Sequence, residues 1–205
     1  MSDKKDEAYQ SGLKVLIFMT PVLLGFSWVL LSSLPETVKM SWFALHPISM
    51  TAAVLLAFVP SILIRQMKGR WPTKIHGITM MLSCVLMVFG WYVIHTNKDA
   101  ANKPHLVSAH GQAGAIMIIT MIFMSFTSVV ALEPDYKVFV PKPVITYFKL
   151  SHKWGGRMIA IILMYLLYSG FEKILSSMTG VLMGLIFVAA VTLRSAYRSL
   201  VKQVL

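Results

Sequence analysis

Long apolar runs separated by short polar segments dominate the chain. Six such runs cover residues 13–32, 42–64, 75–95, 106–132, 152–170 and 178–193. About 20 apolar residues in a helix cross the hydrocarbon core of a bilayer, and a helix satisfies its own backbone hydrogen bonds there. The pattern predicts an all-α membrane protein with six transmembrane helices, forming one domain over residues 1–205.

The composition supports this prediction. Of the 205 residues, 57% are hydrophobic and 13% are charged, which excludes an ordinary soluble domain and a disordered chain. The net charge of +11 raises the alternative of nucleic-acid binding, but the basic residues stand at the ends of the apolar runs. We therefore expect the lipid bilayer, and no nucleic acid, as the partner.

The positions of Lys and Arg predict the orientation. Fifteen of the 19 basic residues fall on one side of the six-span arrangement, all but Lys39, Lys98, Lys103 and Lys173. Because the side richer in Lys and Arg faces the cytosol, both termini are expected there. The polar segment 1–12 has mixed charge and does not resemble a cleaved signal peptide, so the first span is expected to remain.

Histidines near the ends of four consecutive spans are the candidate chemical groups. His46 and His110 lie a few residues into spans that begin on the non-cytosolic side, whereas His76 and His152 stand near the cytosolic starts of their spans. The two levels are separated by most of the roughly 28 Å of helix between His76 and His95. A histidine within a membrane is costly, so a functional role is the default interpretation.

Facing histidines can bind a metal ion directly or occupy both axial positions of a haem iron. Small residues follow three of them, Gly77, Gly111 with Gly114, and Gly155 with Gly156, and permit the close approach of a planar ligand. A zinc site would favour a carboxylate or thiolate ligand, and no intramembrane acid lies near these four in the sequence. The alternative for any single histidine is a hydrogen bond to a neighbouring helix.

Four motifs in order carry a resemblance to a known family. They are His46-Pro47-Ile48-Ser49-Met50, Lys74-Ile75-His76-Gly77, the stretch from His105 to Gly114, and His152 at the head of the fifth span. With these motifs the chain resembles the eukaryotic cytochrome b561 family, and most closely its short branch of domain-containing transmembrane reductases of internal membranes.

The resemblance implies a central four-helix bundle, formed by spans two to five, that holds two b haems. His46 and His110 would ligate the outer haem iron, and His76 and His152 the inner one. It further implies cytosolic ascorbate as electron donor, and monodehydroascorbate radical or a ferric chelate as acceptor across the membrane. A homodimer in the endoplasmic reticulum or another internal membrane is expected on the same grounds.

Basic side chains at the cytosolic rim suit an anionic donor such as ascorbate. Lys74 matches the family's substrate lysine and is the predicted catalytic residue, and Arg157 is predicted to pair with a haem propionate. The other predicted ascorbate-binding residues are Arg70, Lys149 and Lys153. On the outer side, His105, Lys103 and His95 are the predicted acceptor residues, although interfacial histidines are equally explained by solvation.

Two alternative functions stay open. A transporter would pass a divalent metal between the histidine pairs without haem. A haem-bearing membrane anchor would deliver electrons to a separate redox partner.

Overall fold

The computed structural model of the protein describes residues 32, 34–64, 70–132 and 140–174. The predicted spans 13–32 and 178–193 lie outside this part of the chain, apart from Ser32. The described residues form helices and connecting turns, with no β-strand among them. The elements are α2 (Glu36–Lys39), a 3-10 helix η1 (Trp42–Ala44), α3 (Leu45–Ile64), α4 (Arg70–Ala100), α5 (Ala109–Leu132) and α6 (Lys142–Ile174).

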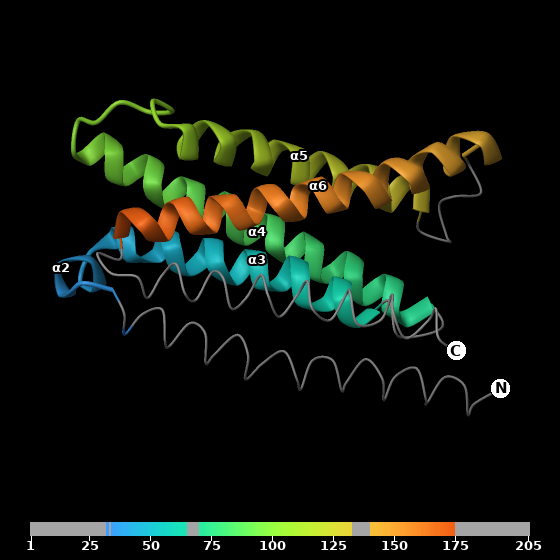
Figure 1. The fold of residues 1–205 in the computed structure, drawn as a ribbon, viewed down its shortest axis with the longest axis horizontal. Coiled ribbons are helices and arrows are strands. Elements are labelled where there is room, and N and C mark those ends of the chain that lie inside the picture. The colour runs from blue at the N-terminus through green and yellow to red at the C-terminus, as the bar shows by residue number, and fades with distance from the viewer. Residues whose placement is uncertain (1–31, 33, 65–69, 133–139, 175–205) are drawn as a thin grey trace.

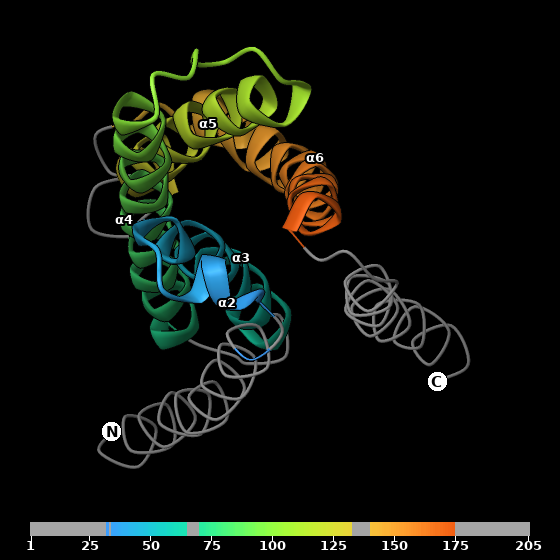
Figure 2. The ribbon, with the colours of Figure 1, turned by 90° about the vertical axis from the view of Figure 1, so that its left-hand side faces the viewer.

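The four long helices lie side by side along the length of the molecule (Figure 1). Seen along its length, α3, α4, α5 and α6 follow one another around a bundle (Figure 2). Each consecutive pair is in contact, and α3 also contacts α6. Residues near the start of α3, the end of α4, the start of α5 and the end of α6 therefore meet at one end of the bundle.

Helix α4 shows how a membrane helix divides its surface. Its buried side chains recur every three or four residues and face the bundle, whereas large apolar side chains on the opposite face are 39–63% exposed in the isolated chain, as at Val85 (63%) and Phe89 (39%). A soluble helix would place polar residues on that exposed face. Among the described residues, three helical stretches are long and apolar enough to cross a membrane: Thr73–Ala100, Ala109–Val129 and Lys142–Ile174.

Small and hydroxylated residues hold the helices close together. Ser83 is fully buried on α4 and donates a 2.7 Å hydrogen bond to the carbonyl of Ala53 on α3. A Cβ atom added at Gly90 would lie 2.6 Å from Ser49 Oγ, so a side chain there would force α3 and α4 apart. Around these contacts lies an apolar core that includes Met87, Met121 and Leu163.

The helices differ in length from the predicted spans. The expected loop 96–104 is helical up to Ala100, because α4 continues beyond the apolar run. Helix α5 begins at Ala109 and not at residue 106, since Leu106 has a left-handed backbone (φ 54°) and the Ser108 side chain caps the helix through the Gly111 N–H.

Helix α6 starts ten residues before its predicted span. The prolines Pro141 and Pro143 favoured a loop in the sequence, but Pro143 stands in the first turn of α6, where a missing N–H costs nothing. His152 consequently lies well inside the helix.

Candidate functional site

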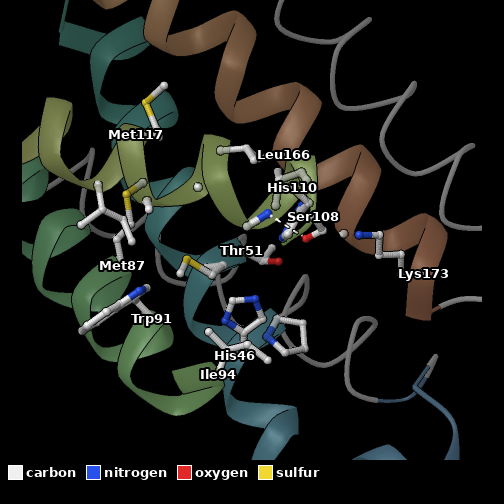
Figure 3. Close-up of a pocket in the computed structure, with 18 of the residues that line it drawn as sticks. His46, Thr51, Met87, Trp91, Ile94, Ser108, His110, Met117, Leu166 and Lys173 are labelled. Atoms are coloured by element: carbon white, nitrogen blue, oxygen red, sulfur yellow. Dashed lines mark hydrogen bonds between the residues drawn. The ribbon is translucent and has the colours of Figure 1, made fainter. Parts of the chain in front are cut away.

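A cavity of about 270 Å³ opens at the end of the bundle where α3 and α5 begin. His46 of α3 and His110 of α5 both line it, and α4 and α6 contribute further walls, including Trp91 and Lys173 (Figure 3). The structure thus brings together the two histidines that the sequence assigned to the outer level. Most of the remaining lining is apolar, as a planar hydrophobic cofactor requires.

Hydrogen bonds fix the orientation of both imidazoles. His46 Nδ1 lies 2.8 Å from the Gly90 carbonyl oxygen, which can only accept, so Nδ1 carries the hydrogen. His110 Nδ1 lies 2.9 Å from Ser169 Oγ, whose own hydrogen is donated to the Leu166 carbonyl. Each ring therefore donates through Nδ1, and Nε2 is the nitrogen suited to ligating iron.

Two features of the cavity match a bound group with polar substituents and a flat face. Thr51 Oγ1 is buried and has no hydrogen-bond partner among the described residues (Figure 3). Gly114 also lines the cavity, and a Cβ atom added there would meet nothing within 4 Å. A buried hydroxyl left unpaired is unfavourable, so a ligand that accepts its hydrogen would stabilise the site.

At the opposite end of the bundle, His76 of α4 and His152 of α6 approach each other. Their ring centroids lie 6.0 Å apart and the ring planes are almost perpendicular, at 84°. Imidazoles bound to opposite sides of one metal ion, each at about 2 Å, have centroids roughly 6 Å apart. At this spacing both imidazoles could hold one haem iron.

The inner pair shares the hydrogen-bonding pattern of the outer pair. Ser61 Oγ lies 3.3 Å from His76 Nδ1 and donates its own hydrogen to the Ala57 carbonyl. Ser128 Oγ lies 2.8 Å from His152 Nδ1. All four histidines therefore engage a neighbouring group through Nδ1, which makes Nε2 the common ligand atom.

The glycines next to the histidines divide into two kinds. Gly77 and Gly156 would meet nothing within 4 Å if they carried a Cβ atom, so each borders open space beside the inner pair. Gly155 would contact Met124 Sδ at 3.2 Å, and Gly170 would contact His110 Cε1 at 3.2 Å. The first kind leaves room for a ligand, and the second lets helices and imidazoles pack closely.

The predicted ascorbate-binding residues lie toward the inner end. Lys74, Lys149 and Lys153 are exposed on α4 and α6. Arg70 is the first residue of α4, and its side chain is not among those described. Arg157 is exposed and stacks over the Trp154 ring at 4.6 Å, so its predicted pairing with a propionate stays a prediction.

At the outer end, His95 and His105 meet around Asp99. His95 Nδ1 lies 3.0 Å from one carboxylate oxygen of Asp99, and His105 Nε2 lies 2.7 Å from the other. Both histidines also line the cavity that holds His46 and His110, whereas the third predicted acceptor residue, Lys103, is exposed in the loop.

Sequence reasoning missed Asp99 and the serines that orient the imidazoles. The polar residues around Asp99 predict a loop. The spacing of four residues between His95 and Asp99 indicates instead that both side chains lie on one face of a helix. Ser169 bonds to a histidine 59 residues away, and no local pattern identifies such a pair.

Comparison with known proteins agrees with this geometry. The model for eukaryotic cytochrome b561 matches residues 45–178, a range that holds all four membrane histidines. The chain is 29% identical over 146 residues to a human protein named "Transmembrane reductase CYB561D2", and 28% identical over the same length to its mouse counterpart. These matches cover 66% of this chain and 62% of each relative, so the chain spans less than two thirds of their length. Because the family match extends over more than half of its residues, the chain belongs to the eukaryotic cytochrome b561 family.

Proposed function

We propose that the protein transfers electrons across a membrane, from cytosolic ascorbate through two b haems to monodehydroascorbate radical or ferric iron on the other side. Family membership implies haem b. The observation that carries the proposal is the presence of two histidine pairs at opposite ends of one helical bundle. The relatives named transmembrane reductase support the same class of activity.

His76 with His152 would hold the inner haem, and His46 with His110 the outer one. Bound haem supplies a one-electron carrier at each level. The protein contributes the ligands, the Nδ1 hydrogen bonds that set their orientation, and an apolar surrounding that excludes water.

Ascorbate would bind where the inner end is basic. Lys74 is exposed two residues before His76, and Lys149 and Lys153 are exposed on the facing helix α6. These cations, together with Arg70, attract and orient an ascorbate anion. Ascorbate gives up one electron and one proton to become monodehydroascorbate radical, and Lys74 would hold the anion during this step.

The orientation follows from the basic residues and the positive-inside tendency, with both termini in the cytosol. We further propose a homodimer in the endoplasmic reticulum or another internal membrane. The resemblance to the short branch supports both statements.

The test is haem stoichiometry and ascorbate reduction of the purified full-length protein. Wild type is expected to contain two haems per chain that ascorbate reduces, and His76→Ala is expected to retain one. Met80→Leu is the matched control, because Met80 lies one turn along the same helix and packs against the core. Full haem content in His76→Ala would overturn the ligand assignment.

The same experiment separates the alternative functions. Two haems that ascorbate cannot reduce would favour a haem-bearing anchor for another redox partner. Protein without haem, made under haem-sufficient conditions, would return attention to divalent-metal transport.

A further inference from the structure

Three side chains at the mouth of the outer cavity converge on a shared point. His95, Asp99 and His105 each offer one ligand atom, and these atoms lie within 4.8 Å of one another. The two imidazole rings stack with centroids 4.0 Å apart and planes inclined by 19°. Both rings therefore present a nitrogen to the same carboxylate.

The separations match those of ligands on one face of a metal ion. Ligands about 2.1 Å from one ion and at right angles to each other lie about 3.0 Å apart. The carboxylate oxygens of Asp99 lie 3.0 Å and 2.7 Å from the nitrogens of His95 and His105. Two imidazoles and one carboxylate, with the remaining positions open, form the ligand set that suits non-haem iron.

The charge of the cluster favours a cation over an organic anion. Asp99 is 56% exposed and contributes the negative charge between two imidazoles. The amino group of the adjacent Lys98, which also lines the cavity, donates a 3.1 Å hydrogen bond to the Pro104 carbonyl. Two stacked imidazolium ions would repel each other, whereas one metal ion replaces both protons and neutralises the carboxylate.

The cluster is held in place by its surroundings. His95 and Asp99 are one turn apart on α4. The His95 ring also packs against the Trp91 ring, with the ring centroids 5.1 Å apart. The loop that carries His105 is closed by backbone hydrogen bonds from Asn102 and Lys103 to the last turn of α4. Gln112 of α5 donates a further 2.9 Å hydrogen bond to the Leu106 carbonyl. Such support fixes ligands in advance of binding.

We infer that His95, Asp99 and His105 are the ligands that hold the ferric ion while it accepts the electron, and that Asp99 favours this ion over an organic radical. The inference rests on the proposed function, since the cluster lines the cavity of the outer histidine pair. Each Fe³⁺ takes up one electron and becomes Fe²⁺. That electron comes from ascorbate on the cytosolic side, which becomes monodehydroascorbate radical and releases a proton there.

Metal binding is measured by calorimetric titration of haem-loaded, full-length protein with Zn²⁺, a redox-inert ion for this ligand set. Wild type is expected to bind one Zn²⁺ per chain. Loss of a group that only hydrogen-bonds a metal ligand weakens metal binding by roughly 10- to 100-fold. Asp99→Asn and His105→Asn remove a ligand itself and are expected to weaken Zn²⁺ binding by at least this factor. Glu172→Gln is the matched control, because it removes an exposed carboxylate at the same end of the bundle, outside the cavity lining.

Acceptor specificity is measured by reoxidation of ascorbate-reduced protein. Asp99→Asn is expected to slow reduction of ferric citrate by at least about tenfold, while leaving reduction of ferricyanide, which needs no protein ligand, unchanged. Zn²⁺ is expected to inhibit the first reaction and not the second, because Zn²⁺ would occupy the ligands that the ferric ion needs, whereas ferricyanide needs no protein ligand. Asp99→Glu is expected to restore part of both metal binding and ferric reduction.

The outcomes separate this inference from the proposed function. Wild-type Zn²⁺ affinity in both Asp99→Asn and His105→Asn would overturn the metal site while leaving ascorbate-driven haem reduction intact. Slowed reduction of monodehydroascorbate in Asp99→Asn, without a change in metal binding, would overturn it in favour of an organic acceptor. Zn²⁺ binding that depends on Asp99, in protein that ascorbate cannot reduce, would retain the metal site and overturn the proposed electron donor.

Discussion

The two ends of the bundle hold similar histidine pairs in different surroundings. In both pairs each Nδ1 lies within hydrogen-bonding distance of a group on a neighbouring helix. Toward the inner end, the described part of the chain includes six basic residues and no acidic one: Arg70, Lys74, Lys142, Lys149, Lys153 and Arg157. The outer end combines Lys39, Lys98, Lys103 and Lys173 with Glu36, Asp99 and Glu172.

This difference separates the holding of a cofactor from the choice of a substrate. The imidazole geometry repeats, and under the proposed function both ends would hold the same kind of cofactor. The charges differ: the purely basic inner rim would receive an anion, whereas the outer rim includes carboxylates, of which Asp99 would receive a cation. Electrostatic complementarity of this kind sets which small molecule approaches each end.

The largest predicted effect comes from removing one ligand at each end. His152→Ala is expected to abolish reduction by ascorbate, because the electron cannot enter at the inner level. His110→Ala is expected to leave ascorbate reduction of the remaining haem intact and to abolish electron transfer to an outside acceptor. Stopped-flow absorbance with each variant in vesicles measures both steps. Identical defects in the two variants would contradict the assignment of the ends.

A smaller effect is expected from the serines that orient the imidazoles. Ser169→Ala removes the group bound to His110, and Ser128→Ala removes the group bound to His152. Each is expected to weaken haem retention at its own end by about 10- to 100-fold. Transfer of haem to excess apomyoglobin measures the loss. Ser125→Ala is the control, because Ser125 lies on α5, the helix of Ser128, and contacts Cys84 instead of a histidine.

The lysines of the inner rim are expected to contribute less, because they are exposed. Lys74→Gln should raise the ascorbate concentration for half-maximal reduction by about fivefold. The effect should shrink as salt is added, since the interaction is screened. Lys39→Gln, at the outer end, should leave ascorbate dependence unchanged. An effect of Lys74→Gln that is insensitive to salt would argue against a simple electrostatic role.

The smallest effect concerns the middle of the bundle, which joins the two ends. Ser83→Ala removes the buried hydrogen bond to the Ala53 carbonyl and is expected to cost about 0.6 kcal/mol of unfolding free energy. Thr120→Ala, whose hydroxyl bonds within its own helix, should cost less. Unfolding in detergent by added sodium dodecyl sulfate compares them. Loss of haem from one end only in Ser83→Ala would show that the ends are not equally supported.

The helices and the levels of the four histidines were predictable from the sequence, because apolar runs and depth are local properties. The predicted runs 42–64 and 75–95 both fall on observed helices, η1 with α3, and α4. The helical extensions were harder to predict. Residues 96–100 and 142–151 are helical but lie outside the predicted apolar runs, so helix propensity and packing decide their structure.

The contacts of the site were not predictable, because they join distant segments. Ser61 of α3 meets His76 of α4, and Ser169 of α6 meets His110 of α5. Asp99 was not predicted for a different reason, since the polar stretch ending in Pro104 resembles a loop, although α4 continues into it as far as Ala100.

The short segment from His105 to His110 carries one histidine of the cluster of His95, Asp99 and His105, and one histidine of the outer pair. Its shape is set by the left-handed Leu106, the cap at Ser108 and the hydrogen bond from Gln112 to the Leu106 carbonyl. An inserted or deleted residue here would change the distance between the imidazole of His105 and the imidazole of His110. We therefore expect this segment to keep a constant length among proteins that share the acceptor, with insertions and deletions falling in other connections.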